Sequence, residues 1–175
     1  SFHYIYMFTP FNFIIIFLIA ILSILLSIVS TSPEKREEIA ECKVYRRIEN
    51  MKHCGNNSYL IHYGEANCQR FNRQINSGEF SDVGIEWIHC TTKCLGEELQ
   101  RIHHEDPLLS CDILESKAFS THVPCYLNCH FCNVCKTQKW SMFKTYRIRD
   151  FLNLHSIHQV YQIINECGLF TCFQS

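Results

Sequence analysis

Residues 81–103 read SDVGIEWIHCTTKCLGEELQRIH and carry the best-defined helical pattern of the chain. Apolar or small side chains recur there at steps of three and four: Ile85, Ile88, Thr91, Cys94, Leu95, Leu99 and Ile102. This spacing places them on one face of an α-helix, which has about 3.6 residues per turn. Cys90 lies one turn before Cys94. The segment therefore predicts a long helix with two cysteines along one side.

The cysteines of the chain are unevenly distributed. All 12 lie between Cys42 and Cys172, and none lies in the apolar stretch that precedes them. An even number of cysteines behind a hydrophobic N-terminal segment is typical of an exported protein with a disulfide framework. Residues 31–175 have the length of one domain, so we expect a single disulfide-rich domain there.

The N-terminal stretch has the composition of a leader. From Phe11 to Val29 it is almost uninterrupted Phe, Ile, Leu and Ala, and small residues follow from Ser30 to Ser32. We expect residues 1–30 to be a signal peptide that is cleaved after Ser30. No Lys or Arg precedes the run, and its length approaches the roughly 20 residues that span a bilayer, so a signal-anchor is the alternative. With the leader removed, we expect a secreted, extracellular protein without membrane contact.

Five further segments carry helical signals, and strand-like alternation is nearly absent. A helix start at Ser32-Pro33-Glu34 is followed by apolar steps as far as Met51. A Ser156-x-x-Gln159 capping box and Gly168 mark the start and the end of the last helix. The other three are expected from about Glu65 to Ile75, from Pro107 to about Ala118 and from Pro124 to about Cys135, while Trp140 to Arg149 is ambiguous. The expected fold is all-α, a small disulfide-stapled domain of about five or six helices behind the leader.

The charge of the chain is nearly balanced. It has 16 Lys and Arg against 17 Asp and Glu, a net charge of −1 with His neutral. The basic clusters Arg46-Arg47 and Lys144 to Arg149 are short and mixed with apolar residues, which is typical of solvated helix faces. The 10 histidines show no HExxH or similar metal-binding spacing. We expect no nucleic-acid partner, no bound metal ion and no cofactor.

A specific set of residues accompanies the cysteines: Cys54, Cys68, Phe71, Gly84-x-x-Trp87-Ile88, Lys93-Cys94, Cys111, Cys125-Tyr126, Cys132 and Cys167. The separation is 14 residues from Cys111 to Cys125, then 7 to Cys132 and 35 to Cys167. Over residues 42 to 167 this pattern resembles the stanniocalcin family of secreted, disulfide-rich glycoprotein hormones.

The resemblance implies a disulfide connectivity and a function. It implies four pairs: Cys42 with Cys68, Cys54 with Cys111, Cys94 with Cys125, and Cys132 with Cys167. It also implies a hormone-like or regulatory protein that binds an extracellular partner, in a family linked to mineral-ion control and to inhibition of pappalysin metalloproteinases. Members of this family form disulfide-linked dimers through a cysteine late in the chain, so the resemblance also raises the alternative of a disulfide-linked homodimer.

Four cysteines lie outside this framework: Cys90, Cys129, Cys135 and Cys172. If the Cys94–Cys125 pair bridges two antiparallel helices, Cys90 lies one turn before its first member and Cys129 one turn after its second. Both then face the same seam, where their Cα atoms can approach the roughly 5.5 Å that a disulfide needs. Helix periodicity therefore predicts a Cys90–Cys129 bridge. Cys135 and Cys172 either pair with each other, or Cys172 links a second copy in a homodimer.

Two metal-binding interpretations compete with the disulfides. Cys125-x3-Cys129-x2-Cys132 has the spacing that holds a [4Fe–4S] cluster in radical SAM enzymes, but such a cluster needs free thiolates in reducing conditions. Zinc could use these cysteines with His130 and Cys135. Thiols oxidise in the secretory pathway, however, and no second cysteine pair elsewhere completes a tetrahedron. We expect these cysteines to be disulfide-bonded.

The segment His122-Val-Pro-Cys125-Tyr126 is similar to the H-D-x-C-Y motif of secreted phospholipases A2. There the His acts as a general base on water, and the following Asp holds Ca²⁺ against the developing oxyanion. Here Val123 replaces that Asp, and the Gly-rich calcium loop is missing. We expect His122 to be a helix-capping or partly buried structural histidine, and the protein not to be an enzyme. A phospholipase A2-like hydrolase that has lost its calcium site and a structural extracellular scaffold are the alternatives.

The sequence also suggests where the surface is modified or bound. Asn56-Asn57-Ser58 is an N-glycosylation sequon in a predicted turn, so we expect a glycan on Asn56. Four aromatic residues are candidates for a partner surface: Phe131, Trp140, Phe143 and Tyr146. The sequence thus predicts a secreted all-α glycoprotein that acts by binding an extracellular protein or receptor.

Overall fold

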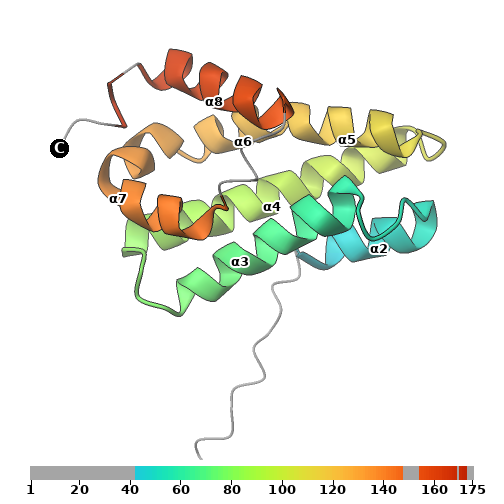
Figure 1. The fold of residues 1–175 in the computed structure, drawn as a ribbon, viewed down its shortest axis with the longest axis horizontal. Coiled ribbons are helices and arrows are strands. Elements are labelled where there is room, and N and C mark those ends of the chain that lie inside the picture. The colour runs from blue at the N-terminus through green and yellow to red at the C-terminus, as the bar shows by residue number, and fades with distance from the viewer. Residues whose placement is uncertain (1–41, 148–153, 169, 173–175) are drawn as a thin grey trace, which may run out of the picture. The chain divides into compact units, whose positions relative to one another are not determined.

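Helices make up every regular element of the described chain (Figure 1). The computed structural model describes residues 42–147, 154–168 and 170–172, and no strand occurs in these ranges. The element order is α2 (Lys43–Lys52), η2 (Tyr59–Glu65), α3 (Ala66–Ile75), α4 (Asp82–Glu105), α5 (Cys111–Ser120), α6 (His122–Asn128), α7 (Phe131–Thr145) and α8 (Leu154–Cys167). The predicted all-α, disulfide-stapled fold is confirmed.

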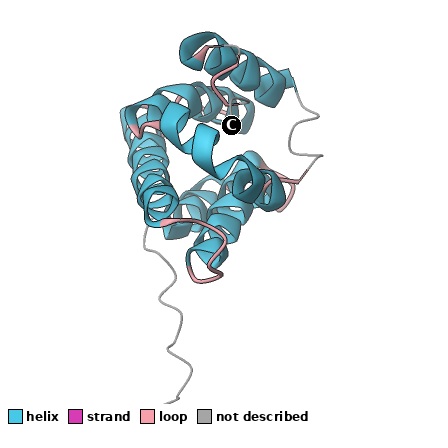
Figure 2. Ribbon diagram, turned by 90° about the vertical axis from the view of Figure 1, so that its left-hand side faces the viewer, coloured by secondary structure: helices cyan, strands magenta, loops and turns pink. Residues whose placement is uncertain are grey.

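The long helix α4 is central to the packing. It contacts α2, α3, α5, α6 and α7, while α8 packs on α5 and α6 (Figures 1 and 2). Ser81 precedes α4 in an extended conformation, and Asp82 places a negative charge in its first turn, where the helix dipole favours it. The helix predicted over residues 81–103 is therefore confirmed.

Two clusters of buried side chains lie along α4, and each end of the helix contributes to one of them. Leu99 and Ile102 belong to a first core, with side chains of α2, η2 and α5. Trp87 and Ile88 belong to a second core, with Phe71 from α3 and side chains of α7. The face predicted from the three- and four-residue spacing is thus shared between two cores.

None of the helices in the described ranges is long and apolar enough to cross a membrane. The described residues all belong to one compact unit, Glu38–Ser175. The expected leader, residues 1–30, lies outside the described residues, and so do Ser32 to Glu34 at the expected start of the first helix. Within the described part, α2 ends at Lys52, one residue beyond the expected Met51.

The predicted start of the fourth helix at Pro107 is wrong. Residues 106–109 form a turn in which the Asp106 carboxylate accepts a hydrogen bond from the Leu108 amide at 3.1 Å. Helix α5 begins only at Cys111, because the Ser110 hydroxyl caps it by accepting from the Ile113 amide at 3.4 Å. Leu108 is 92% exposed and does not share the stripe of Leu114 and Ala118, which are buried.

The single helix predicted from Pro124 to Cys135 is also wrong. Helix α6 ends at Asn128, and α7 starts at Phe131 after a reversal at His130, whose φ is 63°. A left-handed backbone at a residue other than glycine leaves no sequence signal. The ambiguous segment after Trp140 begins as helix, since α7 extends to Thr145 with a kink at Gln138.

The predicted capping box at the last helix is wrong, although the predicted end is correct. Helix α8 already contains Ser156, which is buried within it, so Ser156 does not cap the helix. Gln159 is buried instead, and its side-chain amide donates to the Phe119 carbonyl of α5 at 3.0 Å. Gly168 follows α8 with a φ of 89°, the left-handed conformation that glycine adopts at helix ends.

The helix predicted from about Glu65 to Ile75 occurs as α3, and a π-helical segment that was not predicted precedes it. Segment η2 begins at Tyr59 and runs directly into α3. Gly64 lies where this segment meets α2, and a Cβ atom at Gly64 would overlap the ring of Tyr45. Tyr45 is only 3% exposed, so its ring cannot move into solvent. Gly64 therefore sets how closely η2 and α2 approach.

We expect Gly64→Ala to lower the free energy of unfolding by about 2 kcal/mol, because the added methyl group overpacks a closed contact. Urea titration followed by circular dichroism measures this loss. Adding Tyr45→Leu should recover part of it, so that the double variant is more stable than the sum of the two single effects predicts. Additive effects would show that Gly64 does not act through Tyr45.

Candidate functional site

All twelve cysteines are paired within the chain. The disulfides are Cys42–Cys68, Cys54–Cys111, Cys90–Cys129, Cys94–Cys125, Cys132–Cys167 and Cys135–Cys172. Four of these are the pairs that the stanniocalcin resemblance implies. The other two involve the four cysteines outside that pattern.

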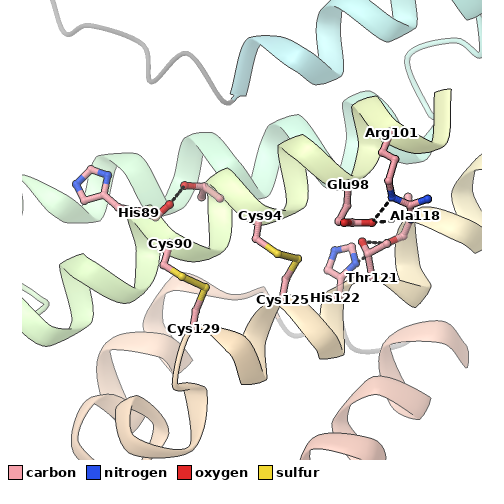
Figure 3. Close-up of a disulfide and its surroundings, with 11 residues drawn as sticks. His89, Cys90, Cys94, Glu98, Arg101, Ala118, Thr121, His122, Cys125 and Cys129 are labelled. Carbon is pink, nitrogen blue, oxygen red and sulfur yellow. Dashed lines mark hydrogen bonds and ion pairs between the residues drawn. A yellow bond between two sulfur atoms is a disulfide. The ribbon is translucent and has the colours of Figure 1, made fainter. Parts of the chain in front are cut away.

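Two of the disulfides lie side by side between α4 and α6 (Figure 3). The Cα atoms are 5.7 Å apart in Cys94–Cys125 and 5.8 Å apart in Cys90–Cys129. The second pair occurs one helical turn from the first, as helix periodicity predicts. The two bridges together fix both the rotation and the sliding of α6 against α4.

The late cysteines join α7 to the C-terminal part of the chain. Cys132 is bonded to Cys167 at the end of α8, and Cys135 is bonded to Cys172. Cys172 was expected either to pair with Cys135 or to link a second copy of the chain, and the structure contains the Cys135–Cys172 pair. Cys125, Cys129 and Cys132 each bond to a different cysteine, so an iron–sulfur or zinc site here would require three of these bridges to be broken.

His122 lies beside the Cys94–Cys125 bridge at the first position of α6 (Figure 3). The side chain is 3% exposed, so it is fully rather than partly buried, and it caps the C-terminal end of α5 by bonding to a carbonyl of the last turn of that helix. Its Nδ1 atom is 2.9 Å from the Ala118 carbonyl, to which it donates. Burial lowers the pKa of His122 to about 4, an effect that this hydrogen bond only partly opposes. The imidazole is therefore neutral at pH 7.

Aromatic rings enclose His122 on several sides. Its ring centroid is 5.3 Å from that of Phe119 and about 6 Å from those of Tyr59, Tyr63 and Tyr126. Val123, the residue at the position of the phospholipase Asp, is itself buried at 8% exposure. These surroundings place the imidazole in a packed interior rather than at an open catalytic cleft.

A small cavity of about 40 Å³ lies next to His122, between the two cores. Three buried polar atoms of its lining have no hydrogen-bond partner within the described part of the chain: Asn67 Nδ2, Trp87 Nε1 and Thr91 Oγ1. A cavity of this size has room for ordered water but not for a substrate or a cofactor.

A second site, the α7–α8 groove, is a predominantly apolar space between α7 and α8 with a volume of about 300 Å³. Its walls are mostly apolar and aromatic: Phe131, Cys135, Met142 and Phe143 from α7, Tyr146 directly after α7, and Val160, Ile163 and Ile164 from α8. Tyr63 and Tyr126 also line it, and Lys139 adds a cationic side chain. The sequence interpretation missed this groove, because α7 was not predicted beyond Cys135.

The four aromatic candidates for a partner surface divide into two pairs. Phe131 and Tyr146 are partly buried and pack against the second core. Trp140 and Phe143 are 70% and 64% exposed, with ring centroids 6.5 Å apart in an edge-to-face arrangement. Trp140 does not line the α7–α8 groove, whereas Phe143 does.

The expected glycosylation site lies in an exposed turn between α2 and η2. Asn56 and Asn57 are exposed. The turn is fixed by Glu49, whose carboxylate accepts hydrogen bonds from the Gly55 amide and from the Ser58 hydroxyl, the latter at 3.2 Å. The side chain of Asn56 is thus accessible in the folded protein.

Comparisons of the chain with protein-family models, with curated proteins and with solved structures found no match. The likeness to stanniocalcins therefore rests on the cysteine framework and the few residues around it.

Proposed function

We propose that the protein is a secreted glycoprotein of stanniocalcin type, a hormone-like or regulatory protein that binds an extracellular protein partner and has no catalytic activity. The observation that supports this most is the set of disulfides. The four pairs implied by the resemblance occur together in one fold: Cys42–Cys68, Cys54–Cys111, Cys94–Cys125 and Cys132–Cys167. Six bridges in a chain of 175 residues also suit an oxidising, extracellular environment.

The exposed aromatic pair supports a role in protein binding. Trp140 and Phe143 present large apolar surfaces to solvent on α7. Tryptophan is among the residues that contribute most to protein–protein affinity, because it buries a large area with little loss of conformational freedom. We propose that Trp140 contacts the extracellular partner directly.

The surroundings of His122 favour this function over the phospholipase-like alternative. A general base must reach a water molecule next to the substrate. The Nδ1 atom of His122 instead donates to the Ala118 carbonyl within a ring of aromatic side chains. Burial and this hydrogen bond give the imidazole a structural role.

Trp140→Ala is expected to weaken partner binding by roughly thirtyfold or more, the range of an interface hot spot. The full chain would be expressed in a eukaryotic secretory host. The protein purified from the culture medium would then be tested for saturable binding to cells and for inhibition of a pappalysin protease. Leu108→Ala removes a 92% exposed leucine from the turn before α5 and serves as the control, with unchanged binding expected.

Three results would contradict the proposal. The first is an oxidised, correctly paired protein that shows neither saturable binding to cells nor protease inhibition. The second is calcium-dependent hydrolysis of phospholipid by the wild-type protein that is lost in His122→Phe. The third is retention of the chain inside the host cells, which would contradict the extracellular location.

A further inference from the structure

The α7–α8 groove separates two helices whose packing partners lie elsewhere. Helix α7 packs on α3, α4 and α6, and α8 packs on α5 and α6. The side chains that line the groove follow helical spacing, at Phe131, Cys135, Lys139 and Met142 on α7 and at Ser156, Gln159 and Ile163 on α8, and Tyr146 lines it directly after α7. The groove is therefore an elongated space between two helix faces.

The lining of the groove is suited to a flexible apolar chain. Met142 and Ile163 are buried beneath it, and Val160 and Ile164 remain partly accessible along α8. Methionine and isoleucine side chains offer no hydrogen bonds, so a ligand gains affinity here mainly by removing apolar surface from water. The volume of about 300 Å³ lies at the lower end of the roughly 300–1,000 Å³ of small-molecule pockets.

Lys139 gives the groove a charge preference. It is the only charged residue among the described residues of the lining, and no described acidic residue faces it there. Its side chain is partly buried, and within the described ranges it takes part in no ion pair or hydrogen bond. A lysine can lay its methylene stem along apolar surface and direct its ammonium group at the rim. An anionic head group fits this position, and a cationic one does not.

We propose that the α7–α8 groove binds a long-chain fatty acid, with the acyl chain between α7 and α8 and the carboxylate on the Lys139 ammonium group. An unbranched acyl chain matches an elongated apolar groove with a single cation, whereas a partner helix would need a complementary set of charges along both rims. This activity is additional to partner binding, because Trp140 lies outside the groove lining.

The test measures equilibrium binding of radiolabelled palmitate, laurate and methyl palmitate to the purified, oxidised full chain. Palmitate is expected to bind one to one, and laurate much more weakly, because each buried methylene contributes about a fourfold gain in affinity. Lys139→Met should weaken palmitate binding about tenfold and leave methyl palmitate binding unchanged. Lys136→Met, which changes an exposed lysine of the same helix outside the lining, should change neither.

A second pair of variants tests the location of the acyl chain. Ile164→Trp fills the groove from α8 and should abolish palmitate binding, whereas Ile157→Trp on the exposed face of α8 should not. Native disulfide pairing by mass spectrometry establishes that each variant is folded. The proposal is overturned by absence of palmitate binding to the wild-type protein, by equal losses in the two lysine variants, or by equal losses in the two tryptophan variants. Partner binding is measured separately through Trp140, so failure of either proposal leaves the other open to test.

Discussion

Removing the Cys54–Cys111 disulfide with Cys54→Ala and Cys111→Ala is expected to lower the free energy of unfolding by about 4 kcal/mol. This bridge has the largest sequence separation of the six, 57 residues, so it restricts the unfolded chain most. Both cysteines are partly exposed, and their truncation leaves little cavity. Against a typical net stability of about 5–15 kcal/mol, this loss is enough to put folding at risk. Urea titration of the oxidised variant measures it.

A matched variant separates loop closure from local contacts at the same place. Lys52 donates hydrogen bonds to the carbonyls of Pro107 and Leu109, close to the bridge, the first at 2.9 Å. Lys52→Met removes these contacts and leaves the disulfide, so a loss of only about 1 kcal/mol is expected. If Lys52→Met lowered the free energy of unfolding as much as removal of the bridge does, local contacts and not loop closure would explain the contribution of this region to stability.

Acidification is expected to destabilise the protein through His122. The folded-state pKa of about 4 lies below the ordinary value of 6.5, so the unfolded chain takes up a proton at higher pH than the folded protein. The contribution of neutral His122 is fully present above about pH 6.5, declines as the pH falls, and is lost below about pH 4. The pKa difference corresponds to about 3 kcal/mol over this window.

His122→Phe should remove this component of the pH dependence. Phenylalanine fits among the aromatic neighbours, and the Ala118 carbonyl keeps the Thr121 hydroxyl as a donor at 2.8 Å. Urea titrations at pH 7, 5.5 and 4 give the comparison, with His89→Gln on the exposed side of α4 as the control. Wild type and His122→Phe should differ by about 3 kcal/mol in their loss between pH 7 and pH 4. Parallel losses in the two proteins would show that His122 is not the group responsible.

Sequence patterns predicted the structure correctly where only one helix signal is present in a segment. The apolar spacing of residues 81–103 gave α4 because no proline or cap interrupts it, and the position of Cys90 one turn from Cys94 gave the second bridge between α4 and α6. At α5, two start signals compete. Pro107 precedes Ser110 by three residues, and the cap at Ser110 determines the start because Asp106 holds the preceding turn.

The parts of the site that were missed depend on tertiary contacts. Burial of His122 needs Tyr59, Tyr63 and Phe119 from other elements, and no local pattern reveals that they converge. The α7–α8 groove needs the full length of α7. Steps of three and four residues from Phe131 to Tyr146 could have indicated that length, but the reversal at His130 hid where the helix begins.

The six disulfides divide the chain into two covalent groups. The bridges from Cys42 to Cys129 overlap one another in sequence, and so do the two bridges between Cys132 and Cys172, but no bridge spans His130. A protease that cuts once anywhere between Cys42 and Cys129 leaves fragments tethered through sulfur. A single cut after His130 severs the only covalent link to the portion that carries the α7–α8 groove, and a denaturing gel run without reductant would show two separate bands.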